Sequence, residues 1–104
     1  MDFLELFDTL DAKTRAALVF RYREELPLPH VAQLVDEDTE LLEQRLGRAL
    51  AQLRDCGALS AAATEEELCQ WLEKLRDEPA LSAFSLVLAV RSQPRRRRFA
   101  RRAG

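Results

Sequence analysis

The fold follows most directly from residues 39–57, which read TELLEQRLGRALAQLRDCG. Apolar residues recur there at the three- and four-residue spacing of one helix face. Asp38 or Thr39 is suited to cap the helix at its start, and Gly57 supplies the left-handed residue that commonly follows a helix end. We therefore expect a helix from about Glu40 to Cys56, with one buried stripe made of Leu42, Leu46, Ala49, Leu50 and Leu53.

Upstream of this helix the sequence predicts a short amphipathic helix within residues 1–10 and two further helices. Apolar residues between Asp11 and Glu25 fit one long helix, for which Asp11 is an acceptable N-cap. Pro27 and Pro29 end that helix, and Pro29 suits the first position of a short helix that follows. A turn at residues 36–37 then leads into the helix described above.

Downstream, Thr64 and Glu67 have the spacing of a capping box at the start of a helix that ends near Asp77. Trp71 lies on the apolar stripe of this helix, and we expect it to close the core against the two helices joined by the turn at residues 36–37, with a partner-binding role as the alternative. Pro79 opens a last apolar segment, which we expect to be helical. The residues predicted to share its face are Leu81, Phe84, Val87 and Leu88.

The charge is divided unevenly along the chain. Residues 1–90 hold 9 Lys and Arg against 18 Asp and Glu, a net charge of −9, whereas residues 91–104 hold 7 Arg and no acid. This division predicts an acidic body with a basic interaction tail. The tail residues Arg95, Arg96, Arg97 and Arg98 are suited to neutralise phosphates or the acidic body of a neighbouring molecule, and the alternative is an unstructured, solubilising end.

Several function classes find no support in the residues. His30, Cys56 and Cys69 do not make a zinc pattern, and both cysteines are expected to be buried as small hydrophobic residues. The sequence has no phosphate loop, nucleophile elbow or metal motif, so we expect a protein that is not an enzyme and needs no cofactor. The start has no basic region followed by a long apolar run, and no stretch is long enough to span a bilayer, so a cytoplasmic address without membrane contact is expected.

The apolar and basic positions between Leu10 and Arg54 follow a known pattern without a gap. Its most specific part is the ending Arg45-Leu46-x-Arg48-Ala49-x-x-x-Leu53-Arg54. In this pattern the chain resembles region 4 of the sigma-70 family, especially the extracytoplasmic-function group. The resemblance covers 45 of the 104 residues, and it leaves out the larger upstream domain of that family. It therefore implies a regulator, half of a split factor or a mimic rather than a complete sigma factor.

The resemblance implies a helix-turn-helix that contacts promoter DNA and RNA polymerase. Its recognition helix would be Thr39–Cys56, in which Gln44, Arg45 and Arg48 are the expected nucleic-acid contacts. Arg95 to Arg98 would add electrostatic attraction. The leading hypothesis is thus a transcription-associated regulator.

The same helix departs from the family in charge, and these departures support a rival hypothesis. The chain has Asp36 in the turn where the family usually has Gly, and it has Leu41 and Glu43 where the family usually has a Thr and a basic residue. The rival is a protein-interaction module, a sigma mimic or adaptor, which binds RNA polymerase or a protein of the sigma or anti-sigma type. Its acidic contact residues would be Glu37, Asp38, Glu40 and Glu43.

These inferences predict an all-α domain of about five helices that contains a helix-turn-helix and carries a basic C-terminal tail. Residues 1–60 would form the region 4-like part, residues 61–90 would add helices that pack on it, and residues 91–104 would be the Arg-rich tail. The sequence does not indicate an oligomeric state.

Overall fold

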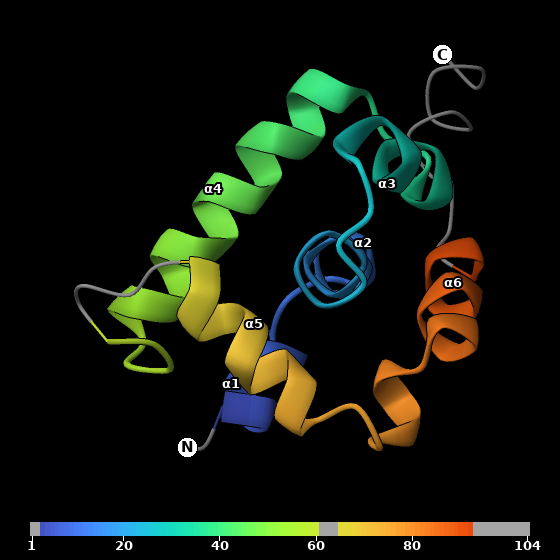
Figure 1. Cartoon of the computed structure of the whole chain (residues 1–104). Helices are drawn as coiled ribbons and strands as arrows, with labels where there is room; N and C mark the ends of the chain where they lie inside the picture. Colours follow the sequence, from blue (N-terminus) through green and yellow to red (C-terminus); the bar gives the residue numbers. More distant parts are fainter. Residues whose placement is uncertain (1–2, 61–64, 93–104) are drawn as a thin grey trace, which may run out of the picture.

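The computed structural model describes residues 3–60 and 65–92, and every regular element in these two ranges is helical (Figure 1). The protein is a small all-α globule with six α-helices in these ranges rather than about five. A π-helical turn, Val19–Arg23, and a 3-10 turn, Pro79–Leu81, complete the elements. The α-helices are α1 (Phe3–Asp8), α2 (Ala12–Leu18), α3 (Leu28–Val35), α4 (Thr39–Asp55), α5 (Glu65–Lys74) and α6 (Ala83–Arg91).

Helix α2 lies at the centre, and α3, α4, α5 and α6 are arranged around it (Figure 1). Ala16, Ala17, Leu18 and Val19 are fully buried, so no face of this segment meets solvent. The predicted helix from Asp11 to Glu25 is confirmed, with its last turn widened to a π-helix. The small side chains of Ala16 and Ala17 allow surrounding helices to approach α2 closely.

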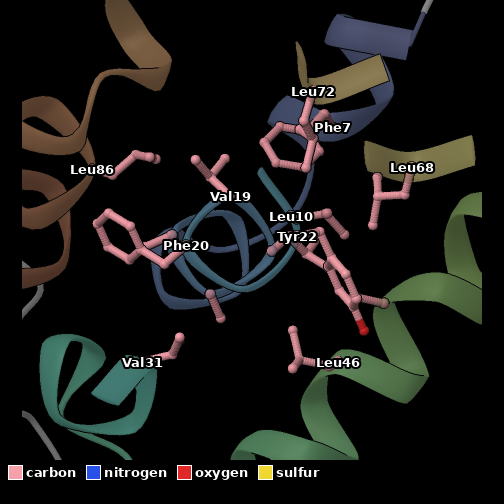
Figure 2. Packing of buried hydrophobic residues seen from close by; sticks show 14 of the residues in the cluster. Phe7, Leu10, Val19, Phe20, Tyr22, Val31, Leu46, Leu68, Leu72 and Leu86 are labelled. Carbon is pink, nitrogen blue, oxygen red and sulfur yellow. The ribbon is translucent and has the colours of Figure 1, made fainter. Parts of the chain in front are cut away.

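The core is formed by apolar side chains that point from the outer helices towards α2 and its π-helical turn. Figure 2 shows Val31 of α3, Leu46 of α4 and Leu86 of α6 directed inward, with Phe20 extending towards Leu86. The predicted stripe of α4 is buried along its whole length. Packing against a central helix, rather than helix propensity, therefore supplies most of the stability of these short helices.

The turns and caps around α4 follow the local sequence. Asp38 caps α4 by accepting the Glu40 N–H at 3.3 Å, Asp36 adopts a left-handed conformation at φ 56°, and Gly57 adopts one at φ 84°. The predicted partner of Glu67, Thr64, lies outside the described residues. The Glu67 carboxylate instead accepts from the backbone N–H of Ser60 at 3.0 Å and from its hydroxyl at 2.9 Å.

The predicted apolar face of the last helix is wrong at Phe84 and Leu88, although Val87 is half-buried and packs against the core. Leu81 is buried, but the helical face that packs inward on α6 contains Leu86 and Val90, while Phe84 is 77% exposed and Leu88 is 53% exposed. The reason is a break in register: Leu81 belongs to the 3-10 turn, and Ser82 is extended before α6 begins. The period counted from Leu81 therefore does not continue into the helix.

Three other side chains differ in part from their predictions. Cys56 is exposed, because α4 ends at Asp55 and the chain turns away at Gly57. Cys69 is half-buried, and its thiol donates to the Tyr22 carbonyl at 2.9 Å. Trp71 is also half-buried, and its ring stacks on Phe3 with centroids 5.1 Å apart, so it closes the core against α1.

The contact between α5 and the π-helical turn includes the only tyrosine of the chain. The Tyr22 hydroxyl donates to Glu65 Oε1 at 3.4 Å. Burial, together with the adjacent Glu65 carboxylate, raises the pKa of Tyr22 to about 12. An unfolded tyrosine ionises near pH 10, so the stability that Tyr22 contributes is fully present below about pH 10 and is lost as the pH rises through about 12.

We expect an alkaline titration, followed by tyrosine absorbance, to show a midpoint near pH 12 while the chain stays folded. Because Tyr22 is the single tyrosine, the absorbance reports this group alone. Glu65→Gln should move the midpoint down towards the ordinary value, since it removes the neighbouring negative charge. A folded chain that titrates near pH 10 would contradict the burial and pairing of Tyr22.

Candidate functional site

Helices α3 and α4 are joined by the three residues Asp36, Glu37 and Asp38, and both helices pack on α2 and on each other. The left-handed Asp36 ends α3, and its N–H is bonded to the Gln33 carbonyl at 3.3 Å. Lys13 donates to the Asp36 carbonyl at 2.9 Å, which ties the turn to α2. The connection between the two helices is thus held by hydrogen bonds to both α2 and α3.

Arg45 lies at the centre of a polar cluster on one flank of α4. Its Nε and Nη2 donate to Glu37 Oε2 at 3.1 and 2.6 Å. Its Nη1 donates to Asp11 Oδ2 at 3.0 Å and to Thr14 Oγ1 at 3.1 Å. The guanidinium therefore bridges α4, the α3–α4 turn and the start of α2, and its side chain is only 22% exposed.

The cluster joins residues that the two sequence hypotheses had separated. Arg45 was an expected nucleic-acid contact and Glu37 an expected protein contact, and the structure pairs the two with each other. Sequence reasoning did not find the role of Asp11 and Thr14. The N-cap pattern at Asp11 placed both residues at the start of a helix, but only the packing of α4 on α2 brings them to Arg45.

Asp11 is ionised more readily than an ordinary aspartate. Partial burial opposes its ionisation, but the hydrogen bonds from Thr14 and the charge of Arg45 outweigh burial and hold the pKa of Asp11 below its usual value. Its carboxylate also accepts the Thr14 N–H at 2.9 Å as the N-cap of α2. One carboxylate thus caps a helix and fixes Arg45.

The outer face of α4 carries the remaining predicted contacts. Gln44 and Arg48 are exposed, as are Glu40 and Glu43. At 100° per residue, Glu40, Gln44 and Arg48 share the stripe that points away from α2. Within residues 3–60 and 65–92, Arg48 makes no hydrogen bond or ion pair, so its guanidinium is available to a ligand.

A shallow hollow of about 280 Å³ lies beside Arg48. Its polar lining includes Asp11, Thr14, Arg45 and Gln52. Two arginines, Arg45 and Arg48, line this hollow. Arg45 is paired with Asp11, whereas Arg48 has no ion-pair partner among the residues that the structure describes. A phosphate or carboxylate oxygen is the kind of ligand that such a guanidinium binds.

The other predicted site residues are placed as follows. Asp38 is exposed and serves as the N-cap of α4, so its carboxylate already has a structural role. Arg95, Arg96, Arg97 and Arg98 lie outside the described residues. No group of three or more His, Cys, Asp or Glu side chains suited to a metal occurs in the described ranges, and none of the helices described there combines the length and apolar character needed to cross a membrane.

Comparison with known proteins adds no relative: no family model, curated protein or solved structure matches the chain.

Proposed function

We propose that the protein is a transcription-associated regulator in which α3 and α4 form a helix-turn-helix similar to sigma region 4, acting on promoter DNA or RNA polymerase. The observation that carries the proposal is the division of α4 into two faces. The stripe that matches the family pattern is buried against α2, and Gln44 and Arg48 stand exposed on the opposite side. A helix anchored in this way can present its outer side chains to a major groove.

The cluster around Arg45 gives that residue a positioning role in this proposal. With Arg45 bound to Asp11 and Glu37, the direct contacts fall to Gln44 and Arg48, an amide suited to adenine and a guanidinium suited to guanine or phosphate. The acids of α4 weaken attraction to DNA, so Arg95 to Arg98 would supply a large part of the affinity through phosphate neutralisation. Binding should accordingly depend steeply on salt.

Arg48→Ala is expected to weaken duplex DNA binding and to reduce the slope of log K against log salt by about 1, the change for one lost phosphate contact. Fluorescence anisotropy of a labelled duplex at several salt concentrations measures both quantities. Arg54→Ala is the matched control, because Arg54 is exposed on another flank of the same helix. Equal losses for the two variants, or no binding by the full chain at low salt, would exclude α4 as the DNA-reading helix.

A second candidate function is supported by Glu40 and Glu43, two exposed carboxylates that lie three residues apart on one side of α4. A pair of exposed carboxylates suits a protein partner that offers basic residues. Under this alternative the chain is a sigma mimic or adaptor.

The double variant Glu40→Lys with Glu43→Lys should abolish capture of purified RNA polymerase by the chain. Glu66→Lys, which reverses the charge of an exposed glutamate on α5, is the control and should leave capture unchanged. Unchanged capture by the double variant would rule out the acidic contact.

A further inference from the structure

Helix α6 leaves large apolar side chains on the protein surface. Phe84 is 77% exposed, and Leu88, one turn later, is 53% exposed. At 100° per residue, the exposed Arg91 falls on the same side of the helix as these two residues. The opposite side of the helix carries Leu86 and Val90, which are buried in the core. We call Phe84, Leu88 and Arg91 the α6 stripe.

The helices around the α6 stripe carry no negative charge. Helix α6 contacts α2 and α3 and lies across α2 from α4 (Figure 1). None of α2, α3 and α6 contains an Asp or Glu, and the sequence from residue 79 to residue 104 contains no acid and seven arginines. Asp77 and Glu78 come before the 3-10 turn that precedes α6, whereas Arg91 is the last residue of α6. The α6 stripe therefore joins exposed apolar side chains to a strongly basic stretch of chain.

We propose that the α6 stripe docks on the surface of an anionic lipid bilayer. Phe84 and Leu88 would enter the boundary between headgroups and acyl chains, where surface helices bury such side chains. Arg91 and the six further arginines of the sequence after it would be attracted to the lipid phosphates. This contact differs from the sequence-based expectation of no membrane contact, which considered only stretches long enough to cross a bilayer.

Other partners fit the α6 stripe less well. A nucleic acid that contacts the arginines through its phosphates would leave Phe84 and Leu88 in water. A stable protein interface usually involves about 20–30 residues on each side, but the other large apolar side chains of α3 and α6 are buried or half-buried. A bilayer needs no shape-matched pocket, so two exposed apolar side chains beside basic residues are enough for a surface contact.

The net charge of −9 on residues 1–90 opposes this docking only weakly. The acids of α4 are separated from α6 by α2, and a helix with its side chains is about 10 Å across. Charges in solvent are largely screened beyond about 8 Å at physiological ionic strength. The uneven charge of the chain therefore orients the protein with the α6 stripe towards the lipid.

Vesicle sedimentation of the full chain tests the proposal without DNA or polymerase. At low salt, the chain should sediment with vesicles made of equal parts of phosphatidylserine and phosphatidylcholine. It should bind vesicles of phosphatidylcholine alone more weakly, because these carry no net negative charge. Raising the salt should release the chain from the mixed vesicles, since screening removes the attraction between arginine and lipid.

Two variants test whether the apolar residues of the α6 stripe make the contact. Phe84→Ser with Leu88→Ser should weaken binding to the mixed vesicles by at least about tenfold, because apolar burial is lost. Leu41→Ser is the matched control: Leu41 is 51% exposed, nearly as much as Leu88, but lies on α4. This variant should bind the vesicles as the wild type does. Every substituted residue is exposed, so both variants should keep the wild-type circular dichroism.

Several results would overturn the proposal. One is a full chain that does not bind the mixed vesicles at low salt. Another is undiminished binding by the double variant, which would mean that charge alone attracts the protein. Duplex DNA binding by the double variant should match that of the wild type, because α6 is not the proposed DNA-reading helix. If the double variant lost DNA binding as strongly as vesicle binding, the α6 stripe would serve nucleic acid instead of lipid.

Discussion

Leu42→Ala is expected to lower the free energy of unfolding by about 2–5 kcal/mol, the range for removing a fully buried leucine from a packed core. Leu42 has no exposed surface and is the first buried residue of α4. Its truncation removes apolar burial and leaves a cavity at the end of α4 next to the α3–α4 turn. For a domain of this size, such a loss is a large part of a total stability of roughly 5–15 kcal/mol.

The neighbouring residue provides a matched control. Leu41→Ala makes the same chemical change one position earlier in the same helix, where the side chain is 51% exposed. Its effect should stay within about 0.5 kcal/mol, as for most surface substitutions. Urea denaturation followed by circular dichroism measures both variants. Similar losses at the two positions would show that the orientation of α4 described above is wrong.

Arg45→Ala is expected to lower the free energy of unfolding by about 1–3 kcal/mol, since it removes charge-assisted hydrogen bonds to three partners. Glu37, whose side chain is only 15% exposed, would also lose its ion-pair partner. Arg48→Ala is the control, because Arg48 is exposed and has no partner in the described part of the chain. The stability of that variant should be close to that of the wild type.

Two further measurements separate the Arg45 cluster from a general loss of packing. Glu37→Gln combined with Arg45→Ala should cost less than the two single changes added together, because the residues interact directly. The lowered pKa of Asp11 means that its contribution is present above the ordinary aspartate range and is lost as the pH falls below about 4. Because Arg45→Ala removes a charge that lowers the pKa of Asp11, the free energy of unfolding of this variant should fall less than that of the wild type between neutral and acidic pH. Additive losses and an unchanged acid profile would contradict the cluster.

The elements of the fold were largely predictable from local sequence. Regular apolar spacing predicted α4 and its buried stripe, and the capping preferences of Asp11, Asp38 and Gly57 predicted where helices begin and end. The prediction failed at α6, where Ser82 interrupts the period between Leu81 and Phe84. A spacing rule assumes one continuous helix, and a break of one extended residue rotates every later side chain to another face.

The candidate site was less predictable, because it depends on contacts between distant residues. Gln44 and Arg48 were predicted to face outward, and both are exposed. Arg45 has the same helix-forming character and charge as Arg48, and nothing in its immediate neighbours predicts that its guanidinium reaches Asp11, 34 residues earlier. That contact exists only because α4 packs across the start of α2.

Residues 38–57 determined by themselves that α4 is a helix, where it begins and which side is apolar, because those properties depend on neighbours within a few positions along the chain. Tertiary packing decided which charges on that helix remain available. It surrounds α2 with the other helices, joins Arg45 to Asp11 and Glu37, and leaves Arg48 and the Leu41 side chain exposed. The physical reason is that a charge is neutralised by whichever opposite charge lies within a few ångströms, and that distance is set by how the helices pack.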